Sequence, residues 1–474
     1  MKKAFLLLCL AAGLMSCSKE ILNTENDNLQ KEGVPMTFNV TVLDTKAAKT
    51  TWTDGDIVYV FFKGLENKYL VLTYDGSEWS NTSGGGTLLD TDFSGLGTKK
   101  LTAVHFPVAV DIAYADSKFS FTSGGKPIYN YYLFEEGKDY TVDGTTVTAT
   151  LSMGKPADMV QIHVAGIQAN VADYTFGCSK IKPVACASVS NTGDISEIVL
   201  QAGARVSGVA DSDGGIFAGR LVYPGESKDY KFTVASNDNI YTLTRSGKAL
   251  SAGKIYNFPL LSTTGGANWA VTDVSDLYVD LGLSVKWAKC NLGAENDYDY
   301  GDYFAWGETT GYNEGKTDFV WSTYAWGTSA VTLTKYCNDS SYGSGGFTDA
   351  LTTLLPEDDA AYAALGGKFR MPTSSEIEEF LHLSKEYVTD YNSSGINGWM
   401  FSGNGNTLFL PAAGHRDERG FFQSYEQSEG YYGSSSSLDP PYPFFALRLE
   451  LTSFSWTVGG SFRYFGCSVR PVSD

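Results

Sequence analysis

The sequence predicts two kinds of structure in succession: a mainly β N-terminal region built from one or two β-sandwiches, and then an α+β domain. A chain of 474 residues is long enough for two or three domains. Its 51 glycines and 29 tyrosines, with few long helical patterns, favour short strands joined by tight turns. Seven of the nine tryptophans and both helical patterns lie from Trp269 onward, so the fold is expected to change near residue 270.

The strands of the first region are predicted from alternating patterns and apolar runs. Alternation of apolar and polar residues begins over 36–42, and 57–62 is a continuous apolar run. A second strand is expected over 69–74, followed by a turn at Asp75 and Gly76. Further short strands are expected at 145–151, 160–164, 197–200, 230–234 and 240–244. This series predicts an antiparallel sandwich over 36–262, or two in tandem with a join near residue 150.

The small residues at 262–267 predict a linker over 263–276, after which a domain is expected over 277–474. Two helices are predicted in this domain. The first covers 356–367, because proline and acidic residues start it, alanines fill it and glycines end it. The second begins at Thr373 or Ser374 and runs to about residue 384. Its buried face is expected at Ile377, Phe380 and Leu381.

The N-terminus predicts export. Two lysines precede a short apolar run over 4–14, which is typical of a secretory signal and too short for a permanent membrane span. Cys17 follows it, and this segment, 1–17, resembles a bacterial lipobox. The resemblance implies that Cys17 is acylated and anchors the chain to a membrane, the alternative being an ordinary signal with a chance cysteine. Residues 18–20 resemble the signal that exports Bacteroidetes lipoproteins to the cell surface, and 18–35 is polar and predicts a flexible tether.

The net charge limits the classes of binding partner. The net charge of −19 argues against nucleic-acid binding and suits a soluble body near an anionic surface.

Five cysteines lie outside the signal, an odd number that allows at most two disulfides. Cys178 with Cys186, and Cys290 with Cys337, are pairs that could form, whereas Cys467 has no nearby partner in the sequence. Small buried thiols are the preferred interpretation for most of them.

Two resemblances cover most of the chain. Residues 52–60 resemble the opening of fimbrillin-like domains, and 252–258 their final strand, which implies a sandwich of the pilin and pilus-adhesin type over 36–262. Blocks in the second half occur in the order of the Fibrobacter succinogenes major paralogous domain family, at 278–288, 300–309, 369–373, 409–414 and 466–472. This family is similar in fold to C-type lectins and formylglycine-generating enzymes, which implies a C-type-lectin-like α+β domain with long loops.

One position departs from the second family. Where its members usually carry a tryptophan before a serine run, this chain has Gly433 before residues 434–437. The missing aromatic anchor is expected to loosen this loop.

No catalytic residue, metal ligand or cofactor site is predicted, and the chain is not expected to be an enzyme. Four histidines are scattered without a metal spacing, and His415 is expected in a solvated charged loop over 415–419, with a ligand contact as the alternative. The carboxylates Glu295, Asp297, Asp299 and Asp302 predict a turn rather than a calcium site. Formylglycine-generating enzymes use a pair of cysteines near the C-terminus, where this chain offers only Cys467, so Cys467 is expected in the core.

A binding surface is the function that remains. Residues 415–465 combine aromatic side chains with serine and glycine, a composition that gives adaptable contact area for proteins and stacking faces for sugars. Filling of the core by the same aromatics is the alternative. The residues predicted to contact a ligand are Tyr425, Tyr431, Tyr432, Tyr442, Trp456 and Arg463. The first four are expected to be exposed tyrosines.

The leading hypothesis is therefore an outer-membrane, surface-exposed lipoprotein that acts as an adhesin, alone or in a pilus, and binds a glycan or a host or bacterial surface protein. Its anchor would bind the membrane, and other fimbrial subunits are further partners. The alternative is a structural fimbrial subunit. That route is disfavoured because pilins of this group are often cleaved after an N-terminal arginine, and the first arginine here is Arg205. A formylglycine-generating oxidoreductase is the least favoured class.

Overall fold

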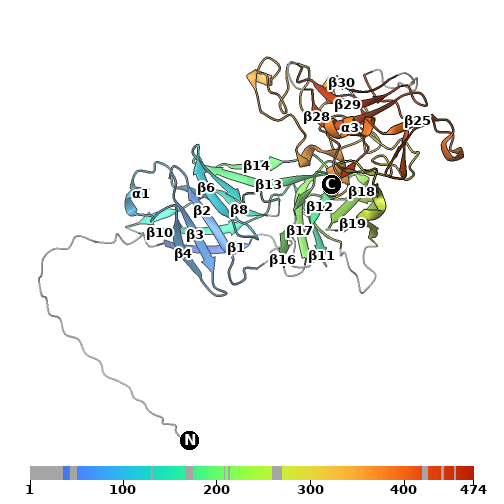
Figure 1. Cartoon of the computed structure of the whole chain (residues 1–474). Helices are drawn as coiled ribbons and strands as arrows, with labels where there is room; N and C mark the ends of the chain where they lie inside the picture. The colour runs from blue at the N-terminus through green and yellow to red at the C-terminus, as the bar shows by residue number, and fades with distance from the viewer. Residues whose placement is uncertain are drawn as a thin grey trace, which may run out of the picture.

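The computed structural model describes residues 36–42, 51–129, 132–144, 146–165, 174–207, 209–211, 214–236, 238–258, 269–418, 425–438, 442–452 and 455–474. Strands dominate, which confirms the prediction of a mainly β protein. Two sandwiches come first, and the C-terminal domain lies against the second of them (Figure 1). Within the described residues, no helix has the length and apolar character needed to cross a bilayer. The predicted signal, Cys17 and the tether lie outside these ranges.

The first sandwich packs a five-stranded antiparallel sheet against a three-stranded sheet. The order of the larger sheet is β4 (Trp79–Gly84), β3 (Tyr69–Tyr74), β2 (Ile57–Phe62), β5 (Lys100–His105) and β8 (Leu133–Asp139). The smaller sheet has β1 (Met36–Val42) at one edge, parallel to β10 (Thr146–Met153), and β9 (Thr141–Asp143) at the other. A short helix, α1 (Asp90–Ser94), lies between β4 and β5 in the chain.

Strand β2 is buried on both faces, which explains why its sequence is a continuous apolar run. Val58, Val60 and Phe62 point into the core between the two sheets of the first sandwich. Tyr59 and Phe61 point the other way, into a second core shared with the next sheet. Period two along a strand places alternate side chains on opposite faces, so both sets must be apolar.

That next sheet joins the two sandwiches through one long strand. Its path is β20 (Ile255–Asn257), β11 (Met159–Ala165), β17 (Gly214–Leu221), β13 (Ile181–Ser190), β7 (Lys118–Thr122) and β6 (Asp111–Ala115), with β14 (Ile195–Val199) and β16 (Val209–Asp211) beside it. One end of β13 pairs with β17 and the other end with β7. The chain therefore passes from the core of the first sandwich to the core of the second sandwich between β10 and β11, close to the join predicted near residue 150.

The second sandwich is closed by a five-stranded sheet. Its order is β15 (Val206–Ser207), β12 (Thr175–Cys178), β18 (Ser227–Ala235), β19 (Asn239–Ala249) and β21 (Ala270–Asp273). Strand β21 lies within the segment predicted as a linker and pairs with β19 over four residues. The second half of that segment thus continues the sandwich instead of separating it from the next domain, because its backbone completes the edge of the sheet.

The C-terminal domain has three small sheets and long irregular segments. The sheets are β22 (Tyr278–Val279), β23 (Lys286–Ala288) and β32 (Val472–Ser473); β24 (Tyr303–Phe304), β31 (Cys467–Ser468), β28 (Gly430–Ser437), β29 (Phe445–Leu451) and β30 (Trp456–Phe462); and β25 (Ser384–Val388), β26 (Gly398–Gly403) and β27 (Asn406–Pro411). Pairing of β23 with β32 joins the start of the domain to its end. This makes the domain a closed unit.

Both predicted helices form, but each is shorter than expected. The first divides into the turn η5 (Pro356–Asp358) and helix α2 (Ala360–Ala364), because Asp359 has an extended backbone and caps α2 through the amide of Tyr362. The second, α3 (Ser374–Leu381), begins at Thr373, which forms a reciprocal capping box with Glu376. It ends at His382 because β25 starts two residues later. Four further turns of 3-10 helix are η2 (Val274–Leu277), η3 (Trp321–Thr323), η4 (Ser344–Gly346) and η6 (Tyr391–Ser393).

The serine run after Gly433 is a strand, so the expected loosening of this segment is wrong. It belongs to β28, where the hydroxyls of Ser434, Ser435 and Ser437 donate hydrogen bonds to backbone carbonyls. A side chain on Gly433 would come within 3.1 Å of Met371. Glycine therefore permits close packing where the family's tryptophan would need space.

Candidate functional site

The structure divides the six predicted ligand residues into exposed and buried groups. Tyr442 and Trp456 are exposed, with 47% and 44% of their surface accessible. Tyr425 is half-buried. The remaining three, Tyr431, Tyr432 and Arg463, are buried at 8%, 2% and 0% accessible. The predicted exposure of Tyr431 and Tyr432 is therefore wrong.

Tyr431 and Tyr432 are buried because β28 is an interior strand, paired with β29 on one side and β31 on the other. The hydroxyl of Tyr432 donates to the carbonyl of Pro411 at 2.5 Å, and burial raises its pKa. On the opposite face of the strand, the ring of Tyr431 lies under the guanidinium of Arg448, 4.2 Å away, while its hydroxyl donates to Glu429. Both tyrosines serve the packing of the sheet.

Arg463 is a structural cation at the end of β30. Its guanidinium lies 4.5 Å from the centre of the Trp306 ring and donates to the carbonyls of Tyr336 at 2.8 Å and Lys335 at 3.3 Å. Burial lowers its pKa. It holds a loop of the domain to the central sheet, and a ligand at the surface would not reach it.

An Arg463→Lys variant is expected to lose about 2 kcal/mol of stability, because an ammonium cannot both stack on Trp306 and span two carbonyls. The urea midpoint of the C-terminal domain, followed by tryptophan fluorescence, measures the loss. Arg370→Lys is the comparison variant: lysine loses the fork that pairs with both oxygens of Glu376, but Arg370 is partly exposed and a charge remains beside Glu376 and Asp474, so its loss should stay below about 1 kcal/mol. Equal midpoints for the two variants would contradict the structural role of Arg463.

The segment around His415 is also buried, so the expected solvated charged loop is wrong for its first three residues. His415 and Asp417 are buried, and the ring of His415 stacks on that of Phe465 at 5.3 Å. The guanidinium of Arg416 lies between two tyrosines, 4.5 Å from the ring of Tyr303 and 3.9 Å from that of Tyr312. Aromatic packing withdraws these polar groups from solvent. Arg419, Phe421 and Phe422 lie outside the described residues.

The exposed Tyr442 stands on three half-buried rings, Phe444, Phe445 and Phe462, and we call these four residues the aromatic cluster. Its ring centre lies 5.8 Å from that of Phe444 and 6.2 Å from that of Phe445. Phe445 and Phe462 face each other across β29 and β30, with ring centres 4.8 Å apart. The cluster therefore presents one exposed ring on a packed apolar base.

Trp456 does not join this cluster. It begins β30, whereas Phe462 ends the same strand, so about 20 Å separates them at 3.3 Å per residue. The ammonium of Lys385 on β25 lies 4.9 Å from the Trp456 ring. Tyr442 and Trp456 are thus two separate contact points at opposite ends of one strand.

The acidic turn at 295–302 has structural partners. Asp297 accepts a hydrogen bond from Tyr391, and Asp299 accepts one from the amide of Asn296. In the part of the chain that the structure describes, no three metal-binding side chains are grouped as ligands. Asp302 is buried, and one of its oxygens accepts from the amides of Tyr303 and Asn313.

Neither predicted cysteine pair is joined. All five cysteines outside the signal are free thiols, and four of them are buried. Cys467 lies in β31 with its sulfur 3.8 Å from the guanidinium of Arg448, consistent with the expected place in the core. Cys290 is the half-buried exception.

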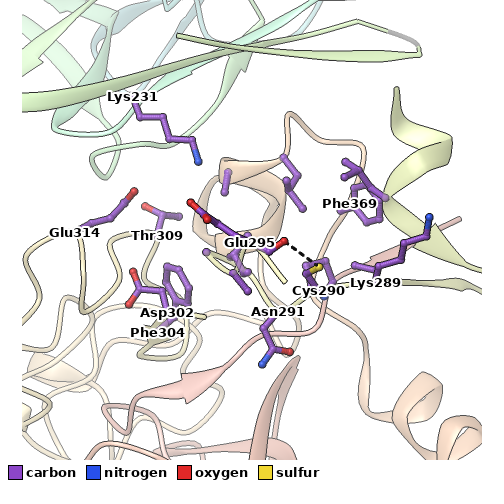
Figure 2. Close-up of a pocket in the computed structure, with 18 of the residues that line it drawn as sticks. Lys231, Lys289, Cys290, Asn291, Glu295, Asp302, Phe304, Thr309, Glu314 and Phe369 are labelled. Atoms are coloured by element: carbon purple, nitrogen blue, oxygen red, sulfur yellow. Dashed lines mark hydrogen bonds between the residues drawn. The ribbon is translucent and has the colours of Figure 1, made fainter. Parts of the chain in front are cut away.

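A cavity of about 550 Å³, which no sequence pattern predicts, lies between the second sandwich and the C-terminal domain. Lys231 on β18 reaches into it from the sandwich, and Glu314, Asp302 and Cys290 line it from the C-terminal domain (Figure 2). These residues lie on segments far apart in the chain, so no local motif could have grouped them. Its apolar wall includes Leu292, Phe304, Leu365, Phe369 and Pro471.

The chain matches no protein-family model, and no curated protein matches it. Three solved structures are similar to it in part. A fimbrial protein from Bacteroides ovatus is 12% identical, with 93% of this chain and 99% of that chain covered and a TM-score of 0.23. A candidate cell adhesion protein from the same species is 12% identical over 51% of this chain and 98% of that one, with a TM-score of 0.25. The fimbrial anchor protein Mfa2 from Porphyromonas gingivalis is 13% identical over 43% and 78%, with a TM-score of 0.21.

Proposed function

We propose that this chain is a lipid-anchored, surface-exposed binding protein of the adhesin type, whose C-terminal domain presents aromatic rings to a glycan or protein. The observation that carries the proposal is the aromatic cluster, in which Tyr442 is exposed on a base of packed phenylalanines. A tyrosine held in this way offers a large contact area and loses little conformational freedom on binding. Trp456 offers a second ring on the same domain, and exposed aromatics of this kind are typical of binding hot spots.

The proposal also includes how the chain is attached to the membrane and which fold presents the aromatic rings. Cys17 and the polar tether would attach the sandwiches to the outer membrane, and the sandwiches would hold the C-terminal domain away from it. A C-type-lectin-like fold for that domain is supported by its three small sheets, its two short helices and the pairing of its first and last strands. We expect no catalysis from it.

The test is a glycan and surface-protein array probed with the full chain and with Tyr442→Ala and Trp456→Ala. Because both side chains are exposed, each variant should keep its melting temperature, and Tyr442→Ala should weaken binding at least tenfold. Phe347→Ala is the control, since Phe347 is also exposed and lies outside the aromatic cluster. Binding that survives both test variants would refute this site, and loss of binding in Phe347→Ala would show that the effect is not specific.

A structural fimbrial subunit is the second candidate, and one observation favours it. Strand β1 lies at the edge of its sheet and, among the residues that the structure describes, pairs with β10 alone. An edge strand leaves a row of backbone groups that can pair with another chain. If the purified chain binds nothing on either array and assembles into fibres, this second function would replace the first.

A further inference from the structure

The cavity between the second sandwich and the C-terminal domain has the dimensions of a ligand site. Its volume of about 550 Å³ lies within the range of about 300–1,000 Å³ that is usual for small-molecule pockets. It also lies at a junction between domains, where such pockets concentrate. Two kinds of surface line it, an apolar wall and a group of charged side chains (Figure 2).

The charged side chains that line the cavity in the described part of the chain form no ion pairs with one another. Asp302 is 3% accessible and Glu314 is half-buried, yet among the described residues neither carboxylate has a basic side chain within the 4.0 Å of an ion pair. Burial raises the pKa of both groups, whereas Lys180 and Lys231 oppose the rise at Glu314, and backbone amides and Arg416 oppose it at Asp302. Lys231 faces them from the sandwich and forms no ion pair with either (Figure 2). Because no described basic side chain contacts either carboxylate directly, an ammonium group that enters the cavity would find acceptor oxygens there, above all on Glu314.

The lining selects an organic cation over a metal ion. No group of three metal-binding side chains exists in the described ranges, and the apolar residues give a metal nothing to coordinate. A primary ammonium, in contrast, has three hydrogen-bond donors for carboxylate oxygens. Phe304 and Phe369 would then cover the apolar body of the same molecule. If the molecule also carries a carboxylate, Lys231 can donate hydrogen bonds to it.

We infer that this cavity binds a small compound that joins an ammonium group to an apolar body, with the ammonium at Glu314 and Asp302. Two sources share this chemistry: a free amine or amino acid, and the N-terminus of a peptide. The inference is independent of the aromatic cluster, which belongs to a different part of the C-terminal domain.

Cys290 provides a readout inside the cavity. It lines the wall and is half-buried, whereas the other four thiols in the described part of the chain are buried. The rate at which iodoacetamide alkylates Cys290 in the full-length protein, read by peptide mass spectrometry, should therefore fall when the cavity is filled. We expect 10 mM phenethylamine to slow alkylation about threefold or more, and 3-phenylpropionate, which lacks the ammonium, to leave it unchanged.

Glu314→Gln should abolish this protection without loss of folding, because no hydrogen bond to the Glu314 side chain is present in the described structure. Glu357→Gln, outside the cavity, should keep it. Phenylalanine amide and the peptide Phe-Gly-Gly distinguish a free amine from a peptide N-terminus. Equilibrium dialysis with radiolabelled phenethylamine measures binding directly. Equal protection by 3-phenylpropionate, unchanged protection in Glu314→Gln, or absence of binding in dialysis would each overturn the inference.

Discussion

In a Gly366→Ala variant, we expect the C-terminal domain to lose its fixed position against the second sandwich. Gly366 follows α2, and its backbone carbonyl accepts a hydrogen bond from the hydroxyl of Thr175 on the sandwich at 2.9 Å. A methyl group on Gly366 would lie 2.0 Å from the methyl group of Ala235, which is less than any real carbon–carbon contact. Because both atoms belong to short, buried segments, the two domains must move apart to relieve the overlap.

Small-angle X-ray scattering of the full chain should show an increased radius of gyration in Gly366→Ala, and calorimetry should show the two regions melting separately. The backbone of Gly366 has φ +74°, so alanine also adds strain of about 1 kcal/mol. Gly395→Ala controls for this strain, because Gly395 has φ +76° and no atom within 4 Å of the added methyl group. A change of the same size in both variants would mean that backbone strain, and not the domain contact, is responsible.

The strands of the sandwiches were predictable because their signals are local. The apolar run of β2 and the alternation of apolar and polar residues in β1 are each complete within one short stretch of the chain. The helix start at Thr373 was predictable for the same reason, since a capping box is complete within four residues. The sequence could not show which sheet covers the second face of β2, or that β13 pairs with strands of both sandwiches. Both features depend on pairing between strands that are distant in the chain.

The candidate site was predicted less well, for a physical reason. Tyr431, Tyr442 and Trp456 belong to one aromatic-rich segment of the sequence, but Tyr431 lies in the interior strand β28, whereas Tyr442 precedes β29 and Trp456 begins β30. Exposure is thus decided by the order of strands in the sheet, which composition does not encode. The cavity is the extreme case, since Lys231 and Glu314 belong to different domains.

The contact between the domains is polar, and it is formed largely by the short segment between β14 and β15. The side chain of Gln201 donates to the carbonyl of Gly307 at 2.7 Å and to Asp358 at 2.9 Å. In return, the hydroxyl of Thr309 donates to the carbonyl of Ala202 at 2.8 Å. Hydrogen bonds of this kind depend on direction, so they fix an orientation more strictly than an apolar contact would.

Arg205 is the centre of this contact, and we expect Arg205→Ala to be the most destabilising change in it. The guanidinium is buried and donates to the carbonyls of Ala363 at 3.0 Å, Thr233 at 3.0 Å and Thr175 at 3.3 Å. Burial lowers its pKa to about 9, so it is still protonated at pH 7. Alanine would remove these three hydrogen bonds and leave the space of a large buried side chain empty, which should cost about 3–5 kcal/mol.

The urea midpoint of the second sandwich measures this loss, and Arg220→Ala is its control. Arg220 lies in the same sandwich but is partly exposed, so its ion pairs with Asp158 and Glu197 should contribute less than about 1 kcal/mol. Arg205→Met separates two explanations, because methionine fills the space and supplies no donor. If Arg205→Met is as stable as the wild-type chain, packing alone accounts for the contribution of Arg205; if it fails as Arg205→Ala does, the hydrogen bonds of the guanidinium, including the one that crosses to Ala363, set the position of the C-terminal domain.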